Sequence, residues 1–153
     1  MLGIGNRSTH PHLSHADNLA MSTQDFLLLV GRVLLGVIFL MSGWGKVMGL
    51  SGFVTAQTAN GVPAFLAYIG PFLEFLAGLG LVLGLATRYS AIGLIIFTIA
   101  ATWIAHRYWI FPEAQQRAQQ TQFMKNAAII GGLLAVFVTG PGRFSVDRWL
   151  SRR

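Results

Sequence analysis

Four apolar blocks of about 20 residues each constrain this chain more than any other feature of its sequence. A helix that crosses a bilayer needs a stretch of that length, because every backbone polar group must be satisfied within the segment. The blocks cover residues 26–45, 64–86, 90–108 and 123–140. None of them alternates with a period of two, which disfavours a membrane β-barrel. We therefore predict an all-α membrane protein, a bundle of four transmembrane helices.

The composition supports this class and excludes others. Only 10% of the residues are charged, against about 25% in an ordinary soluble domain. The formal net charge is +6, but the basic residues lie at the edges of the apolar blocks and form no cluster with aromatics, so we expect a lipid bilayer and no nucleic acid as partner. Because the chain has no cysteine, a thiol shuttle, a Cys-ligated iron–sulfur cluster and a disulfide within it are excluded.

The chain divides into three parts. Residues 1–25 form a polar tail that we expect to be disordered, residues 26–140 form the transmembrane domain, and residues 141–153 form a basic tail. Translation from Met1 or from Met21 fits the sequence equally, because Met21 opens a shorter frame directly before the first block.

The positive-inside rule predicts that both termini are cytoplasmic. The side that holds the termini carries Arg7, Arg88, Arg143, Arg148, Arg152 and Arg153, whereas the other side carries Lys46, Arg107, Arg117 and Lys125.

Two charged residues lie inside the apolar blocks, where a charge costs several kcal/mol. Arg32 shares a helix face with Gly36 and Gly43, and Glu74 lies between Gly70 and Gly78 on a stripe of small residues that we expect to face the bundle interior. The rise of a helix gives an axial gap of about 6 Å, which predicts an Arg32–Glu74 ion pair. Such a pair either fixes the helix register or forms a proton-relay or ligand site, and a neutral Glu74 is a third interpretation.

A second group of polar residues is expected at the interface away from the termini. It consists of Ser42, Lys46, His106, Lys125 and Asn126. These residues could line a small mouth for an anionic or quinone-like ligand, although snorkelling lysines in an interfacial aromatic belt explain them as well. No catalytic residue, metal site or cofactor motif is predicted, since His106 has no second membrane histidine to complete a metal or haem site.

Five motifs in order resemble the DoxX family of bacterial inner-membrane proteins. They are Gly31-Arg-Val-Leu-Leu-Gly36, Ser42-Gly-Trp-Gly-Lys46, Leu83-Gly-Leu-Ala-Thr-Arg88, Phe123-Met-Lys-Asn126 and Gly140-Pro-Gly-Arg-Phe-Ser-Val-Asp147, and the likeness covers residues 24–148. The resemblance implies a four-helix, multi-pass protein of the bacterial plasma membrane. It also implies an association with redox chemistry, because some relatives are the membrane subunit of a thiosulfate:quinone oxidoreductase and others join complexes of oxidative-stress and thiol defence. The positions that match the family's polar residues are Arg32, Lys46, Glu74, Lys125 and Asn126.

These observations leave several hypotheses for the function. The first is an accessory or quinone-associated membrane subunit that docks a soluble oxidoreductase partner. Alternatives are a stand-alone quinone-linked oxidoreductase, a small proton-coupled transporter that would need to form a homo-oligomer, and a purely structural membrane partner. Whether the chain is an enzyme stays open at this stage.

Overall fold

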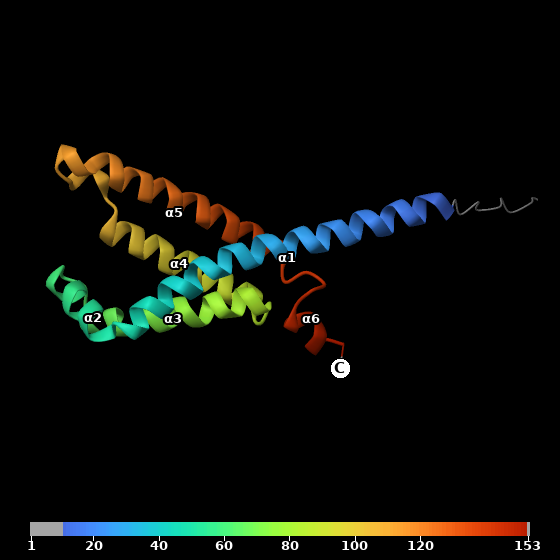
Figure 1. Cartoon of the computed structure of the whole chain (residues 1–153), viewed down its shortest axis with the longest axis horizontal. Coiled ribbons are helices and arrows are strands. Elements are labelled where there is room, and N and C mark those ends of the chain that lie inside the picture. Colours follow the sequence, from blue (N-terminus) through green and yellow to red (C-terminus); the bar gives the residue numbers. More distant parts are fainter. Residues whose placement is uncertain (1–10, 153) are drawn as a thin grey trace, which may run out of the picture.

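Four long helices dominate the computed structural model, which describes residues 11–152 (Figure 1). They are α1 (Pro11–Met48), α3 (Ala64–Leu83), α4 (Thr87–Ala105) and α5 (Glu113–Thr139). Short helices complete the described part of the chain: α2 (Leu50–Ala59), the 3-10 helix η1 (Tyr108–Ile110) and α6 (Val146–Leu150).

Four stretches of the described chain are long and apolar enough to cross a membrane. They are Thr23–Met48, Ala64–Leu83, Thr87–Ile110 and Glu113–Thr139. No strand occurs among residues 11–152. The predicted all-α, four-helix membrane fold is therefore confirmed.

Helices α1 and α5 begin well before the apolar blocks that they contain. Helix α1 begins at Pro11, so residues 11–25 are helical, which corrects the expected disorder for that part of the tail. The expectation for residues 1–10 lies outside the described residues. Helix α5 begins at Glu113, and α2 occupies a connection that hydropathy alone suggests is a loop. Hydropathy marks where a helix is apolar, whereas helix ends depend on local backbone hydrogen bonding.

Helices α1 and α3 are antiparallel and touch backbone to backbone. A Cβ atom added to Gly43 would lie 2.5 Å from the backbone nitrogen of Phe75, and one added to Gly78 would lie 2.6 Å from that of Leu40. Small residues allow this close approach, which drives helix association in lipid. The contact fixes the register: Gly43 lies opposite Phe75, and Leu40 lies opposite Gly78.

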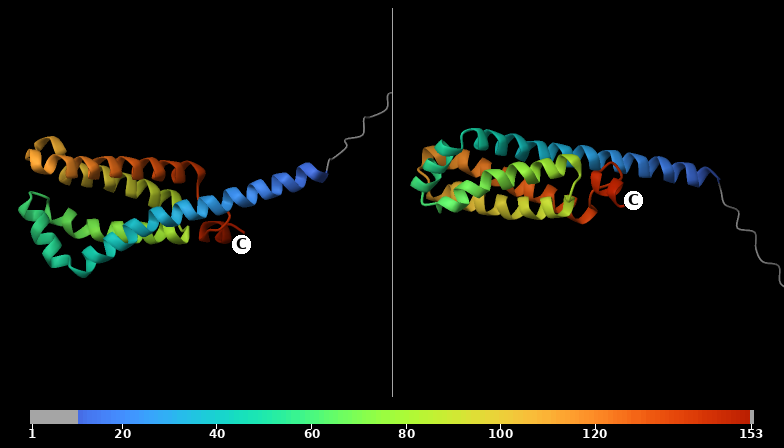
Figure 2. Two further views of the ribbon diagram at one scale, coloured as in Figure 1. Left: turned by 45° about the horizontal axis from the view of Figure 1, so that its top comes forward. Right: turned by 90° about the horizontal axis from the view of Figure 1, so that it is seen from below.

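The core lies where α1 and α3 meet the second helix pair, α4 and α5 (Figure 2). Leu81, Leu94 and Leu133 have no exposed surface and come from α3, α4 and α5, respectively. Large apolar side chains also cover the outside, such as Leu34 at 64% and Ile96 at 63% exposure. This outer apolar surface is what a membrane bundle presents to lipid.

Candidate functional site

Arg32 and Glu74 are both buried, with 2% and 3% exposure, but they do not pair with each other. The carboxylate of Glu74 binds Lys46 instead. Because Gly43 lies opposite Phe75, Glu74 is level with residue 44 of α1, about 18 Å along the axis from Arg32 at 1.5 Å per residue. The predicted gap of about 6 Å assumed that the membrane edges coincide with the ends of the apolar blocks, from which the depth of each residue was counted. The predicted Arg32–Glu74 ion pair is therefore wrong, because the partner of Glu74 is Lys46.

The Lys46–Glu74 ion pair joins the last turn of α1 to the middle of α3. Lys46 Nζ lies 2.5 Å from Glu74 Oε2. The side chain of Glu74 is 4% exposed and that of Lys46 is 30% exposed. The carboxylate thus lies inside the bundle, and the lysine side chain that neutralises it is partly exposed.

Two aromatic rings complete the surroundings of the Lys46 ammonium. Nζ lies 5.7 Å from the ring centre of Phe53 on α2 and 5.7 Å from that of Phe97 on α4. At this distance each ring attracts the cation by about 0.5–2 kcal/mol. An ammonium has three N–H donors, and Glu74 is the acceptor that the described chain provides for one of them. Lys46 therefore stands where α1, α2, α3 and α4 meet, with further donor capacity.

Arg32 binds the chain beyond the last long helix. Its Nη1 donates to the carbonyl oxygen of Pro141, and its Nη2 donates to that of Phe144 at 2.7 Å. The guanidinium fills the space next to Gly84, where an added Cβ atom would collide with Nη1. Gly84 also has φ +68°, so both its backbone conformation and the contact with Arg32 require glycine.

Asp147 caps the first turn of α4 from a distant part of the sequence. Its Oδ1 accepts from the backbone nitrogen of Ala86 at 2.7 Å, and its Oδ2 accepts from the backbone nitrogen and hydroxyl of Thr87, each at 2.9 Å. Burial alone would raise the pKa of Asp147, but these hydrogen bonds and the nearby charge of Arg32 outweigh it and lower that pKa. The carboxylate therefore stays charged and satisfies donors that a helix start leaves unpaired.

The hydrogen-bonded members of the second predicted group have separate partners. His106 Nδ1 lies 2.7 Å from Gln119 Oε1, and Asn126 Nδ2 donates to the hydroxyl of Thr102 at 2.8 Å. Ser42 and Lys125 are exposed, and Lys125 donates to the side chain of Gln122. Of this group, Lys46 is the member that joins the buried carboxylate.

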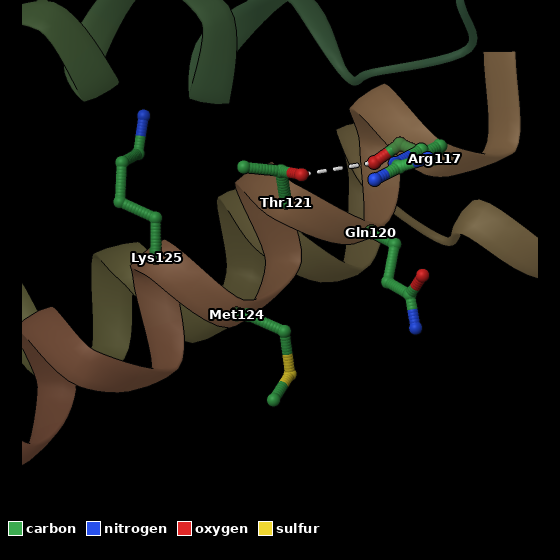
Figure 3. A pocket seen from close by; sticks show the side chains of 5 residues that line it. All are labelled: Arg117, Gln120, Thr121, Met124 and Lys125. Atoms are coloured by element: carbon green, nitrogen blue, oxygen red, sulfur yellow. Dashed lines mark hydrogen bonds between the residues drawn. The ribbon is translucent and has the colours of Figure 1, made fainter.

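The surface of α5 bears a shallow hollow that is open to the outside. Its lining consists of Arg117, Gln120, Thr121, Met124 and Lys125. All five side chains come from one helix and diverge from it (Figure 3). The hollow therefore lacks the concave, convergent lining that is typical of a small-molecule site. Among the described residues, no three His, Asp or Glu side chains are grouped for a metal ion.

Sequence reasoning missed the partners of both buried charges. Two nitrogens of Arg32 donate to backbone carbonyl groups, which leave no mark in the sequence. A signal for Asp147 was present, because it closes the run from Gly140 that carries the family resemblance. Phe53 was missed because it lies on α2, which no apolar block predicts.

Comparison with known proteins gives relatives that this chain matches over most of their length. A family model, DoxX, matches residues 27–107. Inner membrane protein YqjF of Escherichia coli (strain K12) is 35% identical over 130 residues, which cover 85% of this chain and 96% of YqjF. Inner membrane protein YphA of the same organism is 35% identical over 124 residues, which cover 80% of this chain and 89% of YphA.

A third relative bears a name that refers to an activity. CatD of Bacillus subtilis (strain 168), named provisionally as an oxidoreductase, is 37% identical over 60 residues, which cover 39% of this chain and 45% of CatD. No solved structure gives a significant match. With four membrane spans and relatives named as inner membrane proteins, the chain is a multi-pass membrane protein.

Proposed function

The chain belongs to the DoxX family of integral membrane proteins, and from this premise we propose that it is an accessory membrane subunit of a redox system that binds a quinone head group beside Lys46 and Glu74. The observation that carries the proposal is the Lys46–Glu74 pair, in which the Glu74 side chain is buried and the Lys46 side chain is partly exposed. Intramembrane ionisable residues generally mark functional sites.

The surroundings of Lys46 fit a quinone head group. A quinone presents carbonyl oxygens, which accept hydrogen bonds, and a flat ring, which packs on aromatic side chains. Lys46 has N–H donors beyond the one that Glu74 accepts, and the rings of Phe53 and Phe97 lie within 5.7 Å of Nζ. A lipid-soluble ligand would approach Lys46 laterally from the membrane, since the side chain is 30% exposed.

The roles of the chain's own groups follow from this geometry. A bound quinone would supply two-electron redox chemistry. Lys46 would donate a hydrogen bond to a quinone carbonyl oxygen, and Phe53 and Phe97 would flank the ring. Glu74 would hold the Lys46 ammonium in position through the ion pair.

The proposal includes a soluble oxidoreductase as partner and the bacterial inner membrane as location. The chain has no cysteine and so no thiol relay or Cys-ligated cluster, and in the proposal the electrons would come from another protein. The provisional name of CatD supports a redox setting, and the names of YqjF and YphA support the membrane.

Copurification tests the proposal. The chain is purified in mild detergent and its lipid extract is analysed for quinones by mass spectrometry. We expect quinone with the wild type and with Lys125→Met, and at least tenfold less with Lys46→Met. Lys125 is a matched control, because it is an exposed lysine without a carboxylate partner among the described ion pairs.

A double variant separates binding from folding. Lys46→Met combined with Glu74→Leu removes the donor without leaving a buried charge, so the bundle should remain folded. Quinone retained by this folded variant would contradict the proposal. It would favour a structural role for the pair, in which Lys46 and Glu74 only fix the register of α1 and α3.

A further inference from the structure

The chain after α5 is fixed to the bundle by hydrogen bonds. We call residues 140–152 the C-terminal segment. Arg32 donates to the carbonyl groups of Pro141 and Phe144. The carboxylate of Asp147 accepts from the backbone nitrogen of Thr87 at the start of α4. In addition, the backbone nitrogen of Asp147 donates to the Gly84 carbonyl at 2.9 Å. The side chains of this segment therefore have a defined place.

The segment lies beside the N-terminal half of α1, beyond the ends of α3 and α4 (Figure 2). The backbone nitrogen of Arg143 donates to Asp25 Oδ1 at 3.2 Å. A Cβ atom added to Gly142 would lie 3.7 Å from Leu28 Cβ. The segment therefore lies level with residues 25–32, where the candidate span Thr23–Met48 begins. The edge of the hydrocarbon core is expected at the start of such a span.

The exposed side chains of the segment suit that level. Phe144, Trp149 and Leu150 are 54%, 55% and 48% exposed. At the same level of α1, Phe26 is 57% and Leu27 is 62% exposed. Aromatic side chains with an apolar body are enriched at the edge of the hydrocarbon region.

The arginines of the segment provide the charge. The ion pairs of the described chain are Lys46–Glu74 and Arg143–Asp25, so Arg148 and Arg152 have no carboxylate partner there. Both side chains are exposed. The only acid in the segment, Asp147, is committed to the start of α4. A cationic surface beside an apolar one is complementary to an anionic phospholipid.

We propose that the C-terminal segment is a binding site for anionic phospholipid head groups, in which Arg148 and Arg152 bind the phosphate. Phe144, Trp149 and Leu150 contact the acyl chains next to it. An acidic protein surface would also attract the arginines, but it would leave the apolar side chains facing the bilayer edge without a role. The site is at the other end of the bundle from Lys46 and is independent of the proposed function.

Native mass spectrometry of the full chain in mild detergent tests this site. The probes are phosphatidylglycerol and phosphatidylcholine with the same acyl chains. We expect the wild type to prefer phosphatidylglycerol. Each basic residue near an anionic surface contributes about fivefold in affinity, so Arg148→Gln with Arg152→Gln should weaken phosphatidylglycerol binding by about 30-fold. The charge-matched control is Arg117→Gln with Lys125→Gln, two exposed cations on α5 at the opposite end, which should leave that binding unchanged.

Three results would overturn the proposal. They are equal wild-type affinity for the two lipids, equal losses in the two double variants, and no loss in Arg148→Gln with Arg152→Gln. The first would instead favour an acidic protein partner. Arg148→Lys with Arg152→Lys keeps the charges and should keep the lipid preference, which guards against a loss that comes only from misfolding.

Discussion

Lys46 Nζ contacts Glu74 Oε2 at 2.5 Å, and the two partners of this ion pair differ in burial. The carboxylate side chain is 4% exposed, whereas the lysine side chain is 30% exposed. Removal of either partner leaves the other charge behind, and the cost of a lone charge rises with its burial.

The first prediction uses this asymmetry. Lys46→Met should lower the free energy of unfolding by about 3–5 kcal/mol, because it leaves the buried Glu74 without a partner. Glu74→Gln should lower the free energy of unfolding by less, since the remaining Lys46 side chain is less buried. Thermal unfolding in detergent measures both. Equal costs for the two variants, or a larger cost for Glu74→Gln, would contradict this assignment of burial.

The second prediction concerns Arg32 and the C-terminal segment. Arg32→Met removes two charge-assisted hydrogen bonds to carbonyl groups, each of which contributes about 1.5–3 kcal/mol. We expect trypsin to cleave after Arg143 and Arg148 at least tenfold faster in this variant. Arg88→Gln is the control, because Arg88 is exposed and makes one long hydrogen bond, 3.4 Å to the Val138 carbonyl. Unchanged cleavage in Arg32→Met would show that Arg32 does not hold the segment.

The third prediction is a pH dependence due to Asp147, whose pKa is lowered in the folded chain. A lowered pKa stabilises the fold above the ordinary value of about 4, and that contribution is lost as the pH falls through the folded pKa. At pH 6, Asp147→Asn should therefore lower the free energy of unfolding by about 1 kcal/mol, the usual contribution of a helix cap, and so melt at a lower temperature than the wild type. The difference should shrink as the pH falls below about 4. A difference that stays constant down to pH 3 would point to a cause other than the carboxylate charge.

The fourth prediction is the orientation in the membrane, with both ends of the chain cytoplasmic. Since the chain has no cysteine, Ser151→Cys and Asn60→Cys introduce unique labelling sites at opposite ends of the bundle. In intact spheroplasts an impermeant maleimide should label Asn60→Cys at once and Ser151→Cys only after lysis. The reverse pattern would place the termini outside.

Hydropathy predicts the spans but not the pairing between them. The four apolar blocks are long enough to identify each helix, and the stripe Gly70–Glu74–Gly78 correctly indicates which face of α3 turns inward. Pairing depends on the axial register of α1 against α3. That register is set by the contact of Gly43 with Phe75, which the block edges do not reveal.

Other features of the site leave weak marks in the sequence for different reasons. Helix α2 is short and mixes apolar with polar residues, so it has no span-like signal, yet it brings Phe53 to Lys46. The carbonyl partners of Arg32 are common to all residues and cannot be recognised by type. The backbone partners of a side chain such as Arg32 can therefore be identified only in the folded chain.

The most direct test of the quinone site asks where a quinone binds. The wild-type chain is illuminated with an azido-quinone in mild detergent, and the labelled peptides are identified by mass spectrometry. The account predicts adducts on the peptides that hold Lys46, Phe53 and Phe97, which excess unlabelled quinone suppresses and Lys46→Met abolishes. Adducts spread along the lipid-facing helices, or unchanged labelling in Lys46→Met, would contradict it.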